Sequence, residues 1–133
     1  FWFTDTGKDL EMTGYPGKVR ELAWDPTSRF LATGGSPVVT IWDCGGKGPA
    51  GSRPIQFEGH DENLTALAYR HAGPMLAAGS LDGWVSFWPG GAPKRAAIKA
   101  DLESPVTGIA WSPDDRFLAA GCDSGLIAVL APV

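Results

Sequence analysis

The chain has 133 residues, of which 44% are hydrophobic, and its formal net charge is −4 at pH 7, so it suits one domain with a real core. Basic residues do not cluster along the sequence, which argues against duplex nucleic acid or an anionic membrane surface as a partner. The longest apolar run is also far too short to cross a bilayer.

Two short segments at the start of the chain, residues 1–5 and 9–15, resemble strands. After them comes a set of short runs that are rich in β-branched and aromatic residues, which is typical of strands. Turn formers such as Asp25-Pro26-Thr27-Ser28 separate these runs. The sequence therefore predicts a first module of four strands, at residues 19–25, 30–35, 38–43 and 53–58.

The same order of runs continues along the chain. A second module is expected at residues 64–70, 75–80, 84–88 and 94–100, and a third at 106–112, 117–122 and 126–131. The third module lacks a fourth strand. No segment has a sustained apolar stripe with helical spacing, so we expect an all-β fold without a substantial helix.

One phrase occurs three times along the chain, as Leu22-Ala23-Trp24, Leu67-Ala68-Tyr69 and Ile109-Ala110-Trp111. The three aromatic residues lie 45 and 42 residues apart. A fixed period in this range indicates a modular array of repeats.

The modules also carry recognisable end signals. Glu58-Gly59-His60 precedes the second module, and Ile41-Trp42-Asp43 closes the third strand of the first. With these motifs the chain resembles the WD40 repeat family, whose four-stranded β-propeller blades are about 40–45 residues long. The resemblance covers nearly the whole chain and implies antiparallel sheets with strands a to d in each blade. It divides the chain into the outer strands c and d of a preceding blade (1–15), blade 1 (16–58), blade 2 (59–101) and blade 3 without strand d (102–133).

Three blades do not close a ring, since propellers usually have about four to eight. The open edge strands of an incomplete ring invite pairing with other chains. We therefore expect the chain to be a fragment of a longer protein, a reading that the missing initiator Met favours, and to self-associate into a ring of six or nine blades. In such a dimer or trimer, residues 9–15 of one copy would complete the sheet at 106–131 of the next.

The family resemblance implies a structural tetrad in blade 2, a hydrogen-bonded chain of His60, Ser80, Asp82 and Trp88. Such a network helps to fix one packing arrangement. A Ser-His-Asp catalytic triad is the competing interpretation of three of these side chains, but the tetrad is the common feature of this fold.

The outer blades depart from the tetrad pattern. Blade 1 has Gly14-Tyr15 where blade 2 has Gly-His, and blade 3 has Leu130 in place of the Trp. We expect these two blades to depend more on apolar packing.

Metal ligands and cofactors are not expected. No pair among His60, His71, Cys44 and Cys122 has metal-ligand spacing. Two cysteines suggest no disulfide framework, which favours a reducing compartment and a cytoplasmic location.

The family resemblance implies a non-catalytic scaffold that binds other proteins through the end of the propeller where the d–a and b–c loops lie. We call this end the partner face, and its candidate residues are Tyr15, Lys18, Arg20, Pro37, Glu62, Asn63, Trp84, Ser104 and Asp123. The alternative is a propeller that binds a small ligand or sugar through rim aromatics such as Trp84. An enzyme is less favoured, because no converging carboxylates or metal ligands are evident in the sequence.

Overall fold

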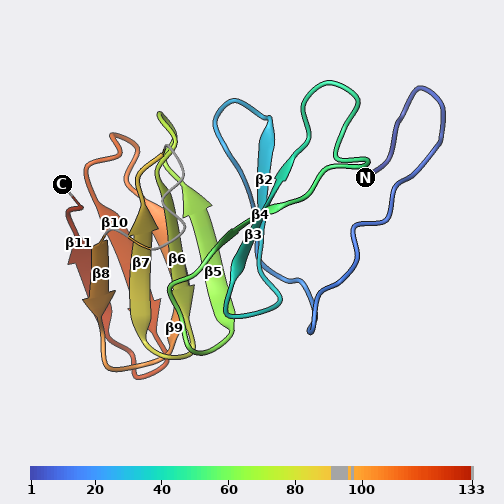
Figure 1. Ribbon diagram of the computed structural model, residues 1–133. Helices are drawn as coiled ribbons and strands as arrows, with labels where there is room; N and C mark the ends of the chain where they lie inside the picture. The colour runs from blue at the N-terminus through green and yellow to red at the C-terminus, as the bar shows by residue number, and fades with distance from the viewer. Residues whose placement is uncertain (91–95, 97, 133) are drawn as a thin grey trace.

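The computed structural model describes residues 1–90, 96 and 98–132 (Figure 1). These residues form eleven strands in three antiparallel sheets and contain no helix. Accordingly, nothing in the described ranges is a helix of the length and apolarity needed to cross a bilayer. The expected all-β fold of four-stranded, propeller-type sheets is confirmed.

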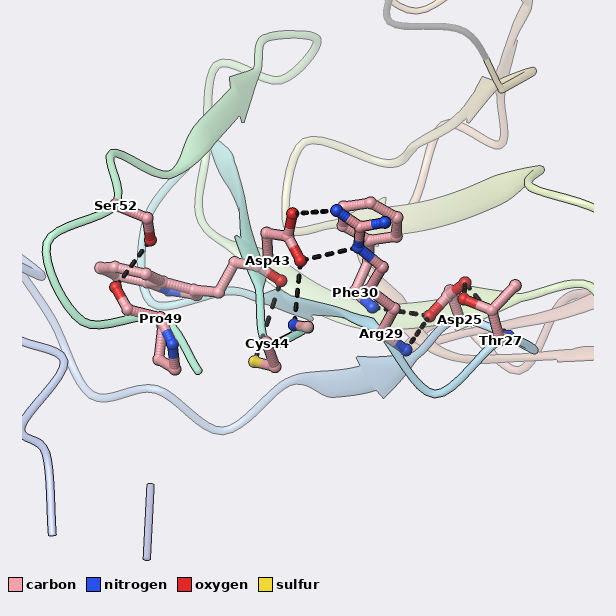
Figure 2. Close-up of polar contacts among 10 residues, drawn as sticks. Asp25, Thr27, Arg29, Phe30, Asp43, Cys44, Pro49 and Ser52 are labelled. Carbon is pink, nitrogen blue, oxygen red and sulfur yellow. Dashed lines mark hydrogen bonds and ion pairs between the residues drawn. The ribbon is translucent and has the colours of Figure 1, made fainter. Parts of the chain in front are cut away.

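The first sheet has the order β1-β2-β3-β4 and consists of β1 (Leu22–Trp24), β2 (Phe30–Thr33), β3 (Val39–Asp43) and β4 (Ile55–Phe57). The turn between β1 and β2 is held by the buried carboxylate of Asp25, which accepts hydrogen bonds from the backbone N–H groups of Thr27, Arg29 and Phe30 (Figure 2). Arg29 in turn pairs with Asp43 at the end of β3, at 2.7 Å. These contacts hold the outer turn to the strand that returns beside it.

The second sheet repeats this order with β5 (Leu64–Tyr69), β6 (Leu76–Ser80), β7 (Trp84–Trp88) and β8 (Ile98–Asp101). The third contains β9 (Val106–Trp111), β10 (Leu118–Cys122) and β11 (Ile127–Leu130). The innermost strand β5 contacts both β1 and β9, so the three sheets follow one another as neighbouring blades. Of the strand expected at 94–100, residues 94, 95 and 97 lie outside the described part of the chain.

The N-terminal segment differs from the expectation of two strands at residues 1–5 and 9–15. Its only ladder contact within the described residues is one antiparallel bridge between Trp2 and Asp9. The physical reason is that a lone two-stranded hairpin is marginally stable in water, and the described strands pair with one another in the three sheets instead of with this segment. The two segments do pair with each other, but through a single bridge instead of the two regular strands that we expected.

The apolar core lies in two layers on either side of the second sheet. One layer joins the first and second sheets through side chains such as Ile41, Phe57 and Trp88. The other joins the second and third sheets through Phe87, Val106 and other residues. Because both of its sides are covered, the second sheet contains the most deeply buried strands, β6 and β7.

The two ends of the array present apolar side chains to solvent. On β1, Leu22 is 61% and Trp24 is 50% exposed, and on β11, Ile127 is 76% and Val129 is 66% exposed. The order of the third sheet leaves β11 as an edge strand. These are the surfaces that a further blade would cover in a closed propeller.

Candidate functional site

Three of the four expected tetrad residues meet around the carboxylate of Asp82, in the turn between β6 and β7. Its Oδ1 lies 3.3 Å from Nδ1 of His60 and accepts a hydrogen bond from the Ser80 hydroxyl. The backbone N–H groups of Trp84 and Asp61 donate to the same carboxylate at 2.9 and 3.0 Å. The loop before β5 is thereby fastened to the β6–β7 turn.

The electrostatics of this cluster keep Asp82 charged and His60 neutral. Burial acts to raise the pKa of Asp82, but hydrogen bonds from Ser80, Trp84 and Asp61 outweigh it and hold this pKa at about 2. Burial lowers the pKa of His60 more than the neighbouring Asp82 raises it. A neutral His60 donates from Nδ1 to Asp82, and Nε2 is then left as an acceptor.

Trp88 joins this cluster only through its ring. The indole stacks on Phe57 with ring centroids 5.7 Å apart, and its centroid lies 6.2 Å from that of His60. In the part of the chain that the structure describes, Nε1 of Trp88, Nε2 of His60 and Oγ of Ser86 are buried without a hydrogen-bond partner. The register places Ala78 opposite Ser86, so the inner strand offers no hydroxyl at this level.

Nucleophilic catalysis does not fit this arrangement. Activation of a serine needs a direct contact between its hydroxyl and the histidine. Here the Ser80 hydroxyl donates to Asp82, and the Ser80 and His60 side chains are fully buried. The cluster is built to join two loops, with no hydroxyl presented to a substrate.

Blade 1 contains a polar chain that the sequence interpretation missed. Trp42 Nε1 donates to the Tyr15 hydroxyl at 2.6 Å, and the Tyr15 hydroxyl lies 2.6 Å from Thr33 Oγ1. The Thr33 hydroxyl in turn donates a hydrogen bond to the backbone carbonyl of Thr40 at 3.1 Å. The expectation that blade 1 depends on apolar packing is therefore wrong, because a tyrosine hydroxyl replaces the histidine as the link.

Two signals in the sequence could have revealed this tyrosine network (Tyr15, Thr33, Trp42). Gly14-Tyr15 stands in the position of Gly59-His60, and Thr33 stands on the inner strand where blade 2 has Ala78. Tyr15, which we had assigned to the partner face, therefore directs its hydroxyl into blade 1.

Blade 3 is joined to blade 2 by an indole. Trp111 Nε1 donates to the carbonyl of Ala68 at 3.1 Å, and its ring meets Phe87 edge to face at 6.0 Å. On the outer turns, the Asp115 carboxylate accepts hydrogen bonds from His71 Nδ1 at 2.8 Å and from the backbone N–H of Ala72 at 2.7 Å. The turn histidine is thus a contact between blades.

The remaining residues of the partner face lie at the end where the d–a and b–c loops gather. Lys18, Arg20, Glu62, Asn63 and Asp123 are exposed, whereas Pro37, Trp84 and Ser104 are half-buried. Open grooves lie at this end. One of about 380 Å³ is lined by Lys18, Arg20 and Asn63, and one of about 590 Å³ by Glu58, His60 and Asp61. A third, of about 690 Å³, begins at Arg20 and Asp123 and continues along the innermost strands β5 and β9.

Trp84 is less available than its rim position suggested. The Lys99 ammonium lies 4.6 Å from the centroid of its ring. This cation–π contact covers part of the indole surface that a sugar would need.

Comparison with known proteins agrees with the architecture. The family model "WD domain, G-beta repeat" matches residues 8–43, 51–89 and 96–129. The chain therefore belongs to the WD40 repeat family. The second and third matches begin a few residues before the outer strands β4 and β8, and the first begins within the N-terminal segment.

Similar curated proteins are longer than this chain. The target of rapamycin complex subunit wat1 of Schizosaccharomyces pombe is 33% identical over 83% of this chain, which spans 34% of that relative. The F-box-like/WD repeat-containing protein TBL1X of Homo sapiens is 27% identical over 92% of this chain and 23% of its own length. Protein HIR1 of Cryptococcus neoformans is 32% identical over 89% of this chain and 15% of its own length. The chain thus spans about a third or less of these relatives.

Proposed function

We propose that this chain is a non-catalytic scaffold that binds other proteins through the partner face. The observation that carries the proposal is the set of open grooves that begin at the d–a and b–c loop end, which mixed charges line and one of which continues along β5 and β9. Lys18, Arg20 and Glu21 line the groove of about 380 Å³, and Arg20, Glu21 and Asp123 line the groove of about 690 Å³. One relative, whose name describes a complex subunit, supports the same role.

The partner face can be tested with charge reversals. Arg20→Glu changes two of these grooves, whereas Lys47→Glu, in the loop between β3 and β4, changes an exposed cation elsewhere. Proteins retained by the immobilised chain should be lost with Arg20→Glu and kept with Lys47→Glu. If both variants retained the same proteins, the binding site would lie outside the partner face. If the unchanged chain retained no protein, the proposed scaffold function would be refuted.

The proposal includes self-association that covers the two exposed ends. Apolar side chains on β1 and β11 would meet in a head-to-tail contact between copies, which closes into six or nine blades. Ile127 is 76% exposed, so Ile127→Lys should leave the fold of a single chain intact and weaken the association. An unchanged association in this variant would contradict the assignment of this surface.

We further propose a reducing, cytoplasmic environment. Cys44 and Cys122 are both free thiols. A structure that does not use its cysteines in a disulfide is compatible with a compartment that keeps thiols reduced.

A further inference from the structure

A cavity lies between blades 1 and 2, at the end of the array that is opposite to the partner face. It has a volume of about 330 Å³, and its wall includes Phe30, Phe57, Tyr69 and Trp88 together with Asp25. The residues come from the β1–β2 turn, from β2 and β4, and from β5 and β7 of the next blade. We call this space the aromatic cavity.

The rings of the aromatic cavity are held firmly in place. Phe57 and Trp88 stack with an interplanar angle of 21°, and both belong to the buried core layer between the blades. Phe30 and Tyr69 pack against that layer but keep part of their surface exposed. Trp88 is 1% and Phe57 8% exposed, so these two rings form a fixed floor, and Phe30 and Tyr69 supply the preformed π surface that a ligand can reach at little cost in side-chain ordering.

The cavity also carries a negative charge. Asp25 is 7% exposed, and the hydrogen bonds to its carboxylate come from uncharged donors in its own turn. Burial acts to raise the pKa of Asp25, but these hydrogen bonds lower it below its ordinary value, so the group is ionised at neutral pH. Asp25 forms no ion pair with any residue that the structure describes.

Among the residues that the structure describes, the cation of the Asp25 turn, Arg29, is already engaged. Arg29 pairs with Asp43 through two hydrogen bonds of 2.8 and 2.7 Å, and its guanidinium carbon lies 5.0 Å from the centroid of the Phe30 ring (Figure 2). Two carboxylates thus stand against one guanidinium at this end of the cavity. For the described residues around the cavity the local charge is therefore negative, and it repels an anionic ligand.

We propose that the aromatic cavity binds a methylated ammonium group, such as the cationic end of a choline-type molecule or a trimethyllysine side chain. Ring faces attract a cation whose methyl groups reduce its hydration, and a nearby carboxylate adds to the attraction. A neutral apolar group would gain only the contact with the rings. This site is separate from the partner face and does not depend on its function.

The test compares choline with its neutral isostere, 3,3-dimethylbutan-1-ol, which has the same shape without the charge. Both are titrated into the chain, and binding is followed by tryptophan fluorescence and by calorimetry. Choline should bind about tenfold more tightly, which is the factor that corresponds to the usual strength of a partly desolvated cation–π contact. Equal binding of the two, or no binding of either, would overturn the proposal.

The repeat itself supplies a matched variant. Blade 3 has Ser112 in the position of Asp25, and its hydroxyl accepts the Phe117 N–H at 3.0 Å. Asp25→Ser should therefore keep an acceptor in the turn while removing the charge. Its choline affinity should fall about fivefold or more, with little change for the neutral isostere. Asp123→Ser, at the opposite end, is the control and should bind choline normally.

A second variant keeps the test decisive if Asp25→Ser unfolds the turn. Tyr69→Leu removes one half-buried ring and retains apolar volume. It should weaken choline binding severalfold and leave the fold intact, and unchanged binding would show that the rings are not the site.

A peptide with one trimethyllysine, compared with the same peptide bearing unmodified lysine, distinguishes the two sources of the ligand. Preference for the methylated peptide assigns the site to a modified protein, and binding of choline alone assigns it to a small molecule. If neither probe binds, the proposal fails.

Discussion

Substitution of Gly79 by alanine tests how tightly blades 2 and 3 pack. Gly79 lies on β6, and a Cβ placed there would be 2.4 Å from Cγ1 and 2.9 Å from Cβ of Val106 on β9. Valine has no flexible end that could move aside, so the backbones of the two blades must separate.

The expected cost follows from this overlap. Overpacking of a filled core typically costs about 1–3 kcal/mol, and the short contact with a branched carbon places Gly79→Ala in the upper part of that range. For a chain of this size the loss should lower Tm by roughly 4–12 °C. Urea denaturation measures the loss of unfolding free energy directly.

Blade 3 provides the matched control. Gly121 lies on β10, where Gly79 lies on β6, but the nearest atom to its added Cβ within 4 Å is Thr107 Oγ1 at 3.7 Å. In a single chain, Gly121→Ala should be neutral or stabilise by roughly 0.5 kcal/mol, because alanine restricts the unfolded chain more than glycine does.

A double variant completes the test. Val106→Ala removes the methyl groups that would be struck, so Gly79→Ala should cost much less in that background. If Gly79→Ala and Gly121→Ala had the same effect on the stability of the dissociated single chain, the argument that the next blade determines the space at this position would be refuted.

Further predictions concern the polar chains and the pH response. Tyr15→Phe leaves Trp42 Nε1 without its acceptor and should cost about 1–3 kcal/mol of unfolding free energy, whereas an unchanged urea midpoint would show that the tyrosine network adds no stability. Ala78→Thr supplies blade 2 with the hydroxyl that Thr33 gives to blade 1, and it should stabilise by about 1 kcal/mol; a loss of stability would show that the buried polar atoms around Ser86 and Trp88 cannot use it. The pKa of Asp82 is held at about 2, below its ordinary value of 3.8. The ionised carboxylate therefore contributes fully to the free energy of unfolding above pH 3.8, and this contribution is lost as the pH falls toward 2. The free energy of unfolding, measured at a series of acid pH values, should therefore depend less on pH in Asp82→Asn than in the unchanged chain. Identical pH profiles would contradict the lowered pKa of Asp82.

The sequence predicted the strands well, because their signals are local. Runs of β-branched and aromatic residues ended at Asp-Pro and Gly-containing turns, and β7 at Trp84–Trp88 has the expected bounds. β1 begins at Leu22 rather than at residue 19, since the cross-strand register with β2 starts only there. At the N-terminus the local signal was present, but the two segments pair through a single bridge, because none of the described strands extends the hairpin.

The site was predicted less completely, because it depends on contacts between distant segments. His60, Ser80 and Asp82 follow a family spacing and do come together. The role of Tyr15 depends on Thr33, which is 18 residues away, and no local pattern connects them. The contact of Asp115 with the turn at His71 spans 44 residues and follows from blade packing alone.

The central claim is that the exposed apolar ends of the three-blade array require further blades from other copies. Light scattering on the purified chain measures this directly, because each closed assembly has a fixed mass. We predict a particle of two or three times the chain mass of 14.0 kDa, stable on dilution. A monodisperse particle of single-chain mass that remains folded with Leu22 and Ile127 exposed would contradict the claim.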